Sequence, residues 1–199
     1  MPLPNNGVGS CGILPSSAFT NTTLNSLETE FSLSHGALLH DIADWKFHSG
    51  DESVGPQKAR QWLQSIKLPE EEIAHICDII HDISFKGAGV DTPMKTLEGK
   101  IVQDADRLDA LGAIGIARCF AYSGHKGRPL YDPTVPITMH QSFDEYKQSG
   151  GSAINHFYEK LLLLKDRMNT PTARRMAEER HKFMEQFLAQ FLAEWEGKK

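Results

Sequence analysis

The most constraining feature of the chain is a histidine and an aspartate that stand side by side in an apolar run. His40 and Asp41 lie at the centre of residues 37–43, which read ALLHDIA. A helix with no polar face is surrounded by protein, and an imidazole or carboxylate buried there destabilises the fold unless a partner satisfies it. Neighbours on a helix do not face each other, so the two cannot satisfy one another. The sequence therefore predicts either hydrogen-bond partners in the core or a bound metal ion.

The composition is that of a soluble globular domain. The chain has 199 residues, of which 40% are hydrophobic and 24% charged, and its formal net charge is −5, values that are ordinary for such a domain. No stripe rich in Lys and Arg is present, which argues against a sequence-independent nucleic-acid binder. No stretch approaches the roughly 20 apolar residues of a membrane span, and no secretory signal is recognisable. Three widely spaced cysteines favour a reducing compartment. We expect a cytoplasmic protein that binds neither nucleic acid nor membrane.

The first 34 residues differ from the rest. They are rich in Asn, Thr, Ser, Gly and Pro, and their only charges are Glu28 and Glu30. Such a composition rarely forms a stable core. We predict a poorly ordered segment over residues 1–34, with a short amphipathic piece near Leu24, Leu27 and Phe31, and a folded domain over residues 35–197.

The folded part has the periodicity of helices. Apolar residues recur at helical spacing between Pro56 and Leu68, between Glu70 and Ile83, from Leu97 into the small-residue segment 110–117, and over residues 154–162. Residues 84–93 and 123–136 read as loops because they are rich in Gly and Pro. No alternating strand pattern competes, so the sequence predicts an all-α domain.

The last helix has the clearest beginning. Thr170 can cap it, and Pro171 suits its first position. One face of this helix is predicted to be apolar and consists of Met176, Phe183, Met184, Phe187, Leu188, Phe191, Leu192 and Trp195.

A second group of acids lies between Ile101 and Leu111. On a helix Asp106 and Asp109 share a face, whereas Asp104 points nearly the opposite way. Two carboxylates on an apolar face repel each other unless a cation lies near them. Together with His40 and Asp41, Asp106 would supply one imidazole and two carboxylates, a set that suits Mn²⁺, Mg²⁺ or Fe²⁺. Because such ions polarise phosphoryl oxygens, hydrolysis of a phosphate ester or anhydride is the expected chemistry.

Several stretches of the chain together resemble one family. They are LLHDIADWKF (38–47), ISFKG (83–87), EGKIVQDADRLDALGAIGIAR (98–118), GRPLYDP (127–133) and NHFYEKLL (155–162). The chain is similar to the HD-domain metal-dependent phosphohydrolases, and most similar to their YpgQ-like branch, over roughly residues 36–197. The resemblance implies an HD-domain helical bundle. It also implies a pyrophosphohydrolase that converts (deoxy)nucleoside triphosphates to a monophosphate and pyrophosphate. Whether the chain forms a homodimer stays open.

The resemblance also implies roles for single residues. His40 and Asp41 match the metal-binding doublet, and Asp106 matches the last ligand, with Asp104 as the alternative. The expected ion is Mn²⁺, with Mg²⁺, Fe²⁺ and Co²⁺ as alternatives. Asp44 matches an acid near the attacking water. Five cationic side chains could contact phosphate: Arg107, Lys46, Lys86, Lys126 and Arg128. Of these, Arg107 is also expected to take part in catalysis.

Two further histidines are weaker candidates. His81, in a second His-Asp doublet, is expected to line the active site or simply to end a helix, rather than to bind metal. His156 could reach the pocket or bond to a neighbouring helix.

One departure from the family is serious. The family's first metal-binding histidine precedes the doublet by some 25 to 30 residues, where residues 9–15 of this chain read GSCGILP. The only earlier histidine is His35, which could share a metal with His40 only if the chain bends at Gly36. The alternative function is therefore a catalytically impaired HD-fold protein that binds nucleotides or a partner.

Overall fold

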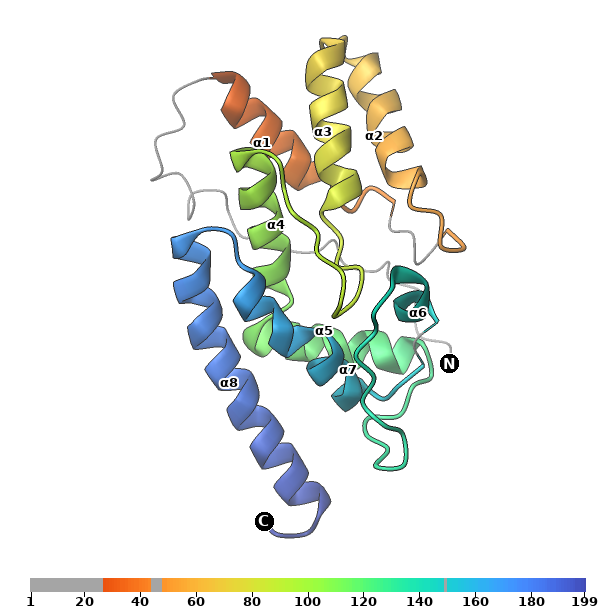
Figure 1. The fold of residues 1–199 in the computed structure, drawn as a ribbon, viewed down its shortest axis with the longest axis vertical. Coiled ribbons are helices and arrows are strands. Elements are labelled where there is room, and N and C mark those ends of the chain that lie inside the picture. Colours follow the sequence, from red (N-terminus) through yellow and green to blue (C-terminus); the bar gives the residue numbers. More distant parts are fainter. Residues whose placement is uncertain (1–26, 44–47, 149) are drawn as a thin grey trace, which may run out of the picture.

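The computed structural model describes residues 27–43, 48–148 and 150–199, with side chains from Phe31 onward. This part of the chain consists of helices and loops and contains no strand (Figure 1). The helices are α1 (Leu27–Leu39), α2 (Val54–Ser65), α3 (Glu70–Asp82), α4 (Leu97–Asp109), α5 (Gly112–His125), α6 (Phe143–Lys147), α7 (Ala153–Glu159), the 3₁₀ helix η3 (Leu161–Arg167) and α8 (Pro171–Trp195). The predicted all-α fold is confirmed, and none of the described helices is long and apolar enough to cross a bilayer.

The first four helices form one half of the molecule. Figure 1 shows α2 and α3 as an antiparallel pair, with α1 packed against both α3 and α4. The α2–α3 pair buries the apolar residues predicted from its periodicity, among them Leu63, Ile73 and Ile76. Helix α1 contacts both α3 and α4 at Gly36, where a Cβ would be 3.5 Å from Val102 and 3.6 Å from Ile79, within ordinary van der Waals contact.

The second half is a larger core made by α4, α5, α7, η3 and α8. Its centre includes Phe157, Leu108 and Met184, all fully buried. The predicted start of α8 is confirmed, because the Thr170 hydroxyl accepts a hydrogen bond from the Ala173 N–H and Pro171 opens the helix. Helix α4 contributes Val102 to the first half and Leu108 to the second, so it joins the two.

The expectation that the helix after Leu97 continues into residues 110–117 is wrong. Helix α4 ends at Asp109, and a new helix, α5, begins at Gly112. Gly112 has φ = +74°, a conformation that glycine adopts without strain. A Cβ at Gly115 would collide with the backbone of Ala110, so small residues let α5 turn sharply against the end of α4. Their role is the close packing of this turn rather than helix continuation.

The start of α1 and the buried face of α8 also differ from the sequence-based expectation. Helix α1 begins at Leu27 and buries Ser32, inside the segment predicted to be poorly ordered. The proposed boundary at residue 34 stays a prediction. On α8, Phe183 and Trp195 are about half exposed, at 48% and 51%, so the buried face is narrower than the apolar one.

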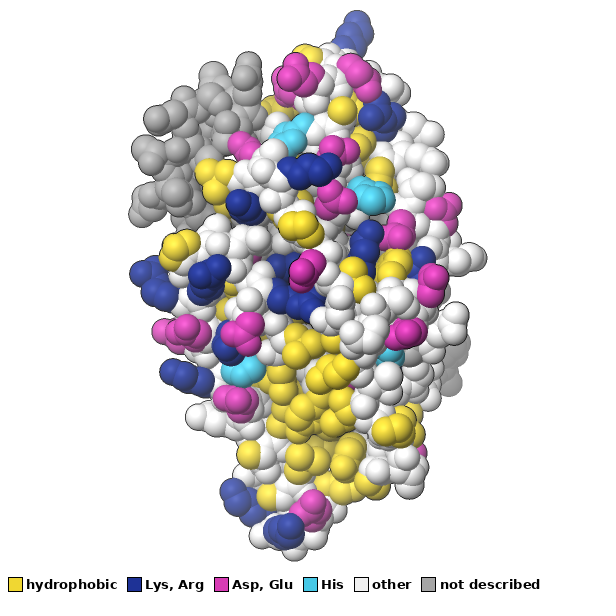
Figure 2. Space-filling view, viewed as in Figure 1, with side chains coloured by type: hydrophobic (Ala, Val, Ile, Leu, Met, Phe, Trp, Pro, Cys, Tyr) yellow, Lys and Arg dark blue, Asp and Glu magenta, His cyan; other side chains and the backbone are white. Residues whose placement is uncertain are grey.

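The long loop after α5 packs against the end of α8. The Tyr131 ring lies 5.4 Å from the Trp195 ring and 6.4 Å from the Phe191 ring. Apolar side chains of this loop remain exposed, among them Leu130 and Ile137, and Figure 2 shows an apolar area on the lower half of the visible face.

Candidate active site

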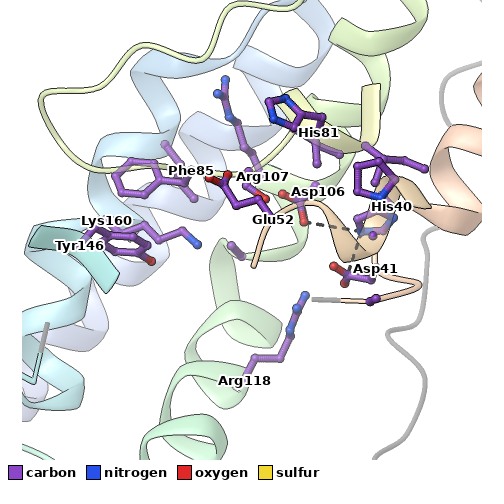
Figure 3. Close-up of a pocket in the computed structure, with 18 residues that line it drawn as sticks. His40, Asp41, Glu52, His81, Phe85, Asp106, Arg107, Arg118, Tyr146 and Lys160 are labelled. Carbon is purple, nitrogen blue, oxygen red and sulfur yellow. Dashed lines mark ion pairs between the residues drawn. The ribbon is translucent and has the colours of Figure 1, made fainter. Parts of the chain in front are cut away.

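A cavity of about 130 Å³ lies where the two halves meet. Its wall is formed by the segment after α1, the start of α2, the end of α3, the end of α4, and residues of α5, α6 and η3 (Figure 3). The charged and polar side chains on the wall are His40, Asp41, Glu52, His81, Ser84, Asp106, Arg107, Arg118, Tyr146 and Lys160. The sequence doublet and Asp106 therefore meet at one cavity.

His40 is held in a single orientation. Helix α1 ends at Leu39, and the His40 Nδ1–H donates a hydrogen bond to the Ala37 carbonyl oxygen at 2.7 Å. Because a carbonyl only accepts, Nδ1 carries the proton in the neutral ring and Nε2 keeps its lone pair. A backbone partner of this kind is typical of metal-binding histidines.

The two carboxylates approach the same ring nitrogen. His40 Nε2 lies 3.4 Å from an oxygen of Asp41 and 3.8 Å from an oxygen of Asp106 (Figure 3). Both distances exceed those of ordinary hydrogen bonds, about 2.7–3.2 Å. Ligand atoms bound to one ion at about 2.1 Å are about 3–4 Å apart, so the spacing fits a ligand set.

His40, Asp41 and Asp106 do not by themselves form a complete metal site. Within residues 31–43, 48–148 and 150–199, no group of three histidine, cysteine or acidic side chains is arranged so that it could hold a metal ion. The side chain of Asp41 is 52% exposed and that of Asp106 is 35% exposed. Both carboxylates are therefore accessible from solvent.

Asp104 faces the N-terminus of α8 rather than the cavity. Its carboxylate is fully buried and accepts hydrogen bonds from the backbone N–H of Asn169 at 2.7 Å and of Thr170 at 2.8 Å. The Asn169 side chain donates a further bond at 2.9 Å. Asp104 thus satisfies the N-terminus of α8, a favourable place for a negative charge. Of the two aspartates, Asp106 is the one on the cavity wall.

His35 does not face the cavity. Helix α1 runs without interruption through Gly36, so the bend that would bring the two histidines together is absent. The His35 ring stacks on Phe31 with centroids 3.8 Å apart, and it lies 5.9 Å from the Trp62 ring. The condition under which His35 could complete the ligand set is not met.

Two cations on the wall were not singled out from the sequence. Figure 3 shows Lys160 across the cavity from His40, and Arg118 pointing from α5 toward Asp41. An Arg118 guanidinium nitrogen lies 3.3 Å from a carboxylate oxygen of Asp109. Both residues fall in stretches that carry the family resemblance, but only the turn at Gly112 brings Arg118 to the cavity.

Glu52 adds a third carboxylate to the wall. It forms an ion pair with Lys86, with 2.8 Å between Nζ and the carboxylate oxygen. Lys86, predicted to contact phosphate, is therefore not on the wall itself but is paired with a residue that is. No pattern in the sequence marks Glu52.

Arg107 lines the cavity, but its guanidinium is bonded away from it. It donates to the Thr92 hydroxyl at 2.9 Å and to the Arg167 carbonyl. Burial lowers its pKa to about 10, against the opposing effect of Asp104 and Asp106, so it stays charged at neutral pH. Arg167 in turn donates to the carbonyls of Gly87 and Val90 at 3.1 Å. These contacts favour a role for Arg107 in holding the loop over residues 84–93; its catalytic role stays a prediction.

The remaining predicted residues differ in their relation to the cavity. Lys126 and Arg128 are not among the residues that line the cavity. The Lys126 ammonium lies 5.6 Å from the Tyr122 ring. Asp44 and Lys46 fall outside the described residues. His81 lines the cavity, whereas His156 does not.

The chain is similar to known proteins over most of its length. An HD domain is matched over residues 25–111. The chain is 41% identical over 162 residues to YpgQ of Bacillus subtilis (strain 168), covering 80% of this chain and 70% of YpgQ. It is 32% identical over 161 residues to protein L803 of Acanthamoeba polyphaga mimivirus, covering 68% of this chain and 63% of that protein.

Two solved structures have a similar fold. An HD-superfamily hydrolase from Bacillus thuringiensis is 48% identical with a TM-score of 0.58, over 83% of this chain and 74% of that one. Bacillus subtilis YpgQ in complex with ADP is 36% identical with a TM-score of 0.57, over 81% of this chain and 74% of that one.

Proposed function

The chain belongs to the HD-domain family, and on that premise we propose that it is a metal-dependent phosphohydrolase that acts on nucleotides. The observation that carries the proposal is the His40 ring, whose Nδ1 is bonded to a backbone carbonyl while Nε2 faces Asp41 and Asp106. The likeness to an HD-superfamily hydrolase supports the reaction class.

His40, Asp41 and Asp106 would hold the metal ion. One nitrogen and several carboxylate oxygens suit Mn²⁺ first, with Mg²⁺, Fe²⁺ and Co²⁺ as alternatives. When bound, a divalent ion polarises phosphoryl oxygens and lowers the pKa of water. The half-exposed Asp41 carboxylate leaves room for substrate beside the ligand set.

The cations on the wall would bind the phosphate chain. Lys160 and Arg118 approach the cavity from η3's start and from α5, so their charges can neutralise phosphates held near Asp106 (Figure 3). The complex of YpgQ with ADP supports a nucleotide as the ligand. We propose a (deoxy)nucleoside triphosphate, cleaved to a monophosphate and pyrophosphate.

Carboxylates would orient the attacking water. Asp44, which matches the family's acid at this step, belongs to the proposal from sequence alone because it lies outside the described residues. Glu52 lies on the wall, and its ion pair with Lys86 fixes the position of its carboxylate.

A second function has one specific observation in its favour. The family's first histidine has no counterpart in the sequence before His35, and His35 itself turns toward Trp62 rather than the cavity. Loss of an outer-shell partner alone weakens metal affinity by about 10- to 100-fold, so the absence of a protein ligand should weaken it at least as much. The alternative is therefore an HD-fold protein that binds nucleotides or a partner without turnover.

One experiment separates the two functions. The purified chain is equilibrated with Mn²⁺, its bound metal is measured by mass spectrometry, and the release of pyrophosphate from each dNTP is followed. A chimera that carries a histidine-bearing first helix serves as the comparison. Turnover by the native chain supports the hydrolase. Turnover by the chimera alone, with nucleotide binding by the native chain, supports the second function, and His40→Ala should abolish metal binding in both proteins.

A further inference from the structure

The second His-Asp doublet of the chain faces the same cavity as the first. His81 lies in the last turn of α3, on the cavity wall, and its side chain is 53% exposed (Figure 3). It is therefore both accessible to a ligand and attached to a packed helix. Nothing in the metal site proposed above uses this residue.

Asp82 fixes the orientation of the His81 ring. His81 Nδ1 lies 2.7 Å from a carboxylate oxygen of Asp82, and because a carboxylate only accepts, Nδ1 donates the hydrogen. The other Asp82 oxygen lies 3.9 Å from the Lys95 ammonium. The Asp82 carbonyl accepts a bond from the Gln103 side chain at 3.4 Å, which ties the end of α3 to α4. Nε2 of His81 is left as the ring atom available for a ligand.

The ring of His81 lies beside a carboxylate and at the end of a helix. Asp82 supplies a carboxylate in direct hydrogen-bond contact, and the C-terminus of a helix is a favourable place for a cation. Cationic imidazole carries a hydrogen on both nitrogens, so Nε2 can then donate.

The other titratable side chains on the wall are poorly suited to give up a proton. They are the carboxylates Asp41, Glu52 and Asp106 together with arginine, lysine and Tyr146. Carboxylic acids ordinarily lose their proton at about pH 4, and tyrosine, lysine and arginine ordinarily keep theirs to about pH 10 or above. His40 is assigned to the metal. Histidine is the side chain that exchanges protons near neutral pH, so among the described wall residues His81 is the one suited to this task.

We propose that His81 is a catalytic residue that protonates the leaving pyrophosphate, a role that rests on the proposed phosphohydrolase function. Water forms a bond to the α-phosphorus, and the bond from that phosphorus to the bridging oxygen breaks. The bridging oxygen keeps the electron pair and takes the proton from His81 Nε2. The proton lost by water passes to solvent, and solvent restores the proton on His81.

Leaving-group dependence tests this role. Wild type and His81→Gln are compared on dTTP and on the p-nitrophenyl ester of thymidine 5′-monophosphate, whose leaving group needs no protonation. We expect kcat on dTTP to fall about 100-fold, with KM nearly unchanged. The rate on the aryl ester should stay within a few-fold of the wild-type rate. Asp82→Asn should lower kcat on dTTP in the same selective way, because the ring loses its charged partner.

His75→Gln is the matched control. His75 lies on the same helix, 3.9 Å from a Glu98 carboxylate oxygen, and is not on the cavity wall, so this variant should keep wild-type rates on both substrates. Equal losses on both substrates in His81→Gln, or no loss on either, would overturn the role of His81 while the hydrolase stands. No turnover by the wild-type chain would overturn both.

Discussion

Two aspartates only two positions apart on α4 have different roles. Asp104 is fully buried and bonded to the N-terminus of α8, whereas Asp106 is partly exposed beside His40. Helix geometry places them on nearly opposite faces. The sequence alone left both open as the last metal ligand, because it does not say which face meets another helix and which meets the cavity.

Asp104→Ala and Asp106→Ala are expected to have opposite effects. Without Asp104, the N–H groups of Asn169 and Thr170 lose a charged acceptor, and the free energy of unfolding should fall by about 3 kcal/mol. Without Asp106, that free energy should change by less than about 0.5 kcal/mol, while Mn²⁺ affinity falls at least about tenfold. Urea denaturation and calorimetric titration measure the two quantities. Asp78→Asn, an exposed acid on α3, is the control for both.

The assignment would be contradicted by the reverse pattern. Folded Asp104→Ala that has lost Mn²⁺ affinity, beside Asp106→Ala that has kept it, would mean that the ligand is Asp104.

Because the thiol of Cys119 is buried, we expect the free energy of unfolding to fall at alkaline pH. Burial raises the pKa of this thiol to about 11, above the usual value of 9.0, against the smaller effect of Ser123. The unfolded chain therefore loses the thiol proton first, so stability is present below pH 9.0 and falls as pH rises toward 11. The free energy of unfolding should drop by about 2 kcal/mol across this range. Urea denaturation of the wild-type chain and of Cys119→Ala at a series of pH values isolates the contribution of this thiol. If the free energy of unfolding falls with pH equally steeply in both proteins, Cys119 is not the cause.

At the scale of elements, the turn between α4 and α5 decides which residue of α5 reaches the cavity. The run of small residues 110–117 reads as one helix by periodicity. The positive φ of Gly112 instead ends one helix and starts another, and this places Arg118 on the wall. A sequence pattern records which residues are small, but not the direction in which the chain turns.

Gly112→Ala tests the turn. The variant must adopt φ = +74°, with its Cβ only 3.1 Å from the Arg180 side chain, so we expect a loss of about 1–2 kcal/mol in the free energy of unfolding. Gly124→Ala is the matched control in α5, since a Cβ there meets nothing within 4 Å; it should raise stability by about 0.5–1 kcal/mol. Thermal denaturation of both variants measures this, and equal effects would argue against strain at Gly112.

At the scale of the whole molecule, the proposed metal ion joins separate helices. His40 and Asp41 follow α1, whereas Asp106 lies on α4. His40 Nε2 lies 3.4 Å from an oxygen of Asp41 and 3.8 Å from an oxygen of Asp106. An ion that binds only the folded chain stabilises it by mass action. The proposed site would therefore also stabilise the fold.

Mn²⁺ should raise the melting temperature of the chain. At about 100 times its Kd, an ion adds about 2.7 kcal/mol, which corresponds to a rise of roughly 5–10 °C for a domain of this size. Differential scanning fluorimetry with Mn²⁺, and again after EDTA, measures the rise and its reversal. The same titration of His40→Ala should show no rise; a similar rise in that variant would place the ion elsewhere.

The sequence by itself determined the all-α class, most of the helices (though not the break between α4 and α5), the start of α8 and the residues that could bind a divalent ion. These follow from local rules: apolar spacing, capping chemistry, and the cost of burying an imidazole beside a carboxylate. Only the tertiary structure decided that Asp106 rather than Asp104 meets His40, that His35 turns away, and that Arg118, Glu52 and Lys160 reach the cavity. The physical reason is that a side chain's environment depends on the helices packed around it. Those contacts join residues far apart in the chain, which local spacing does not encode.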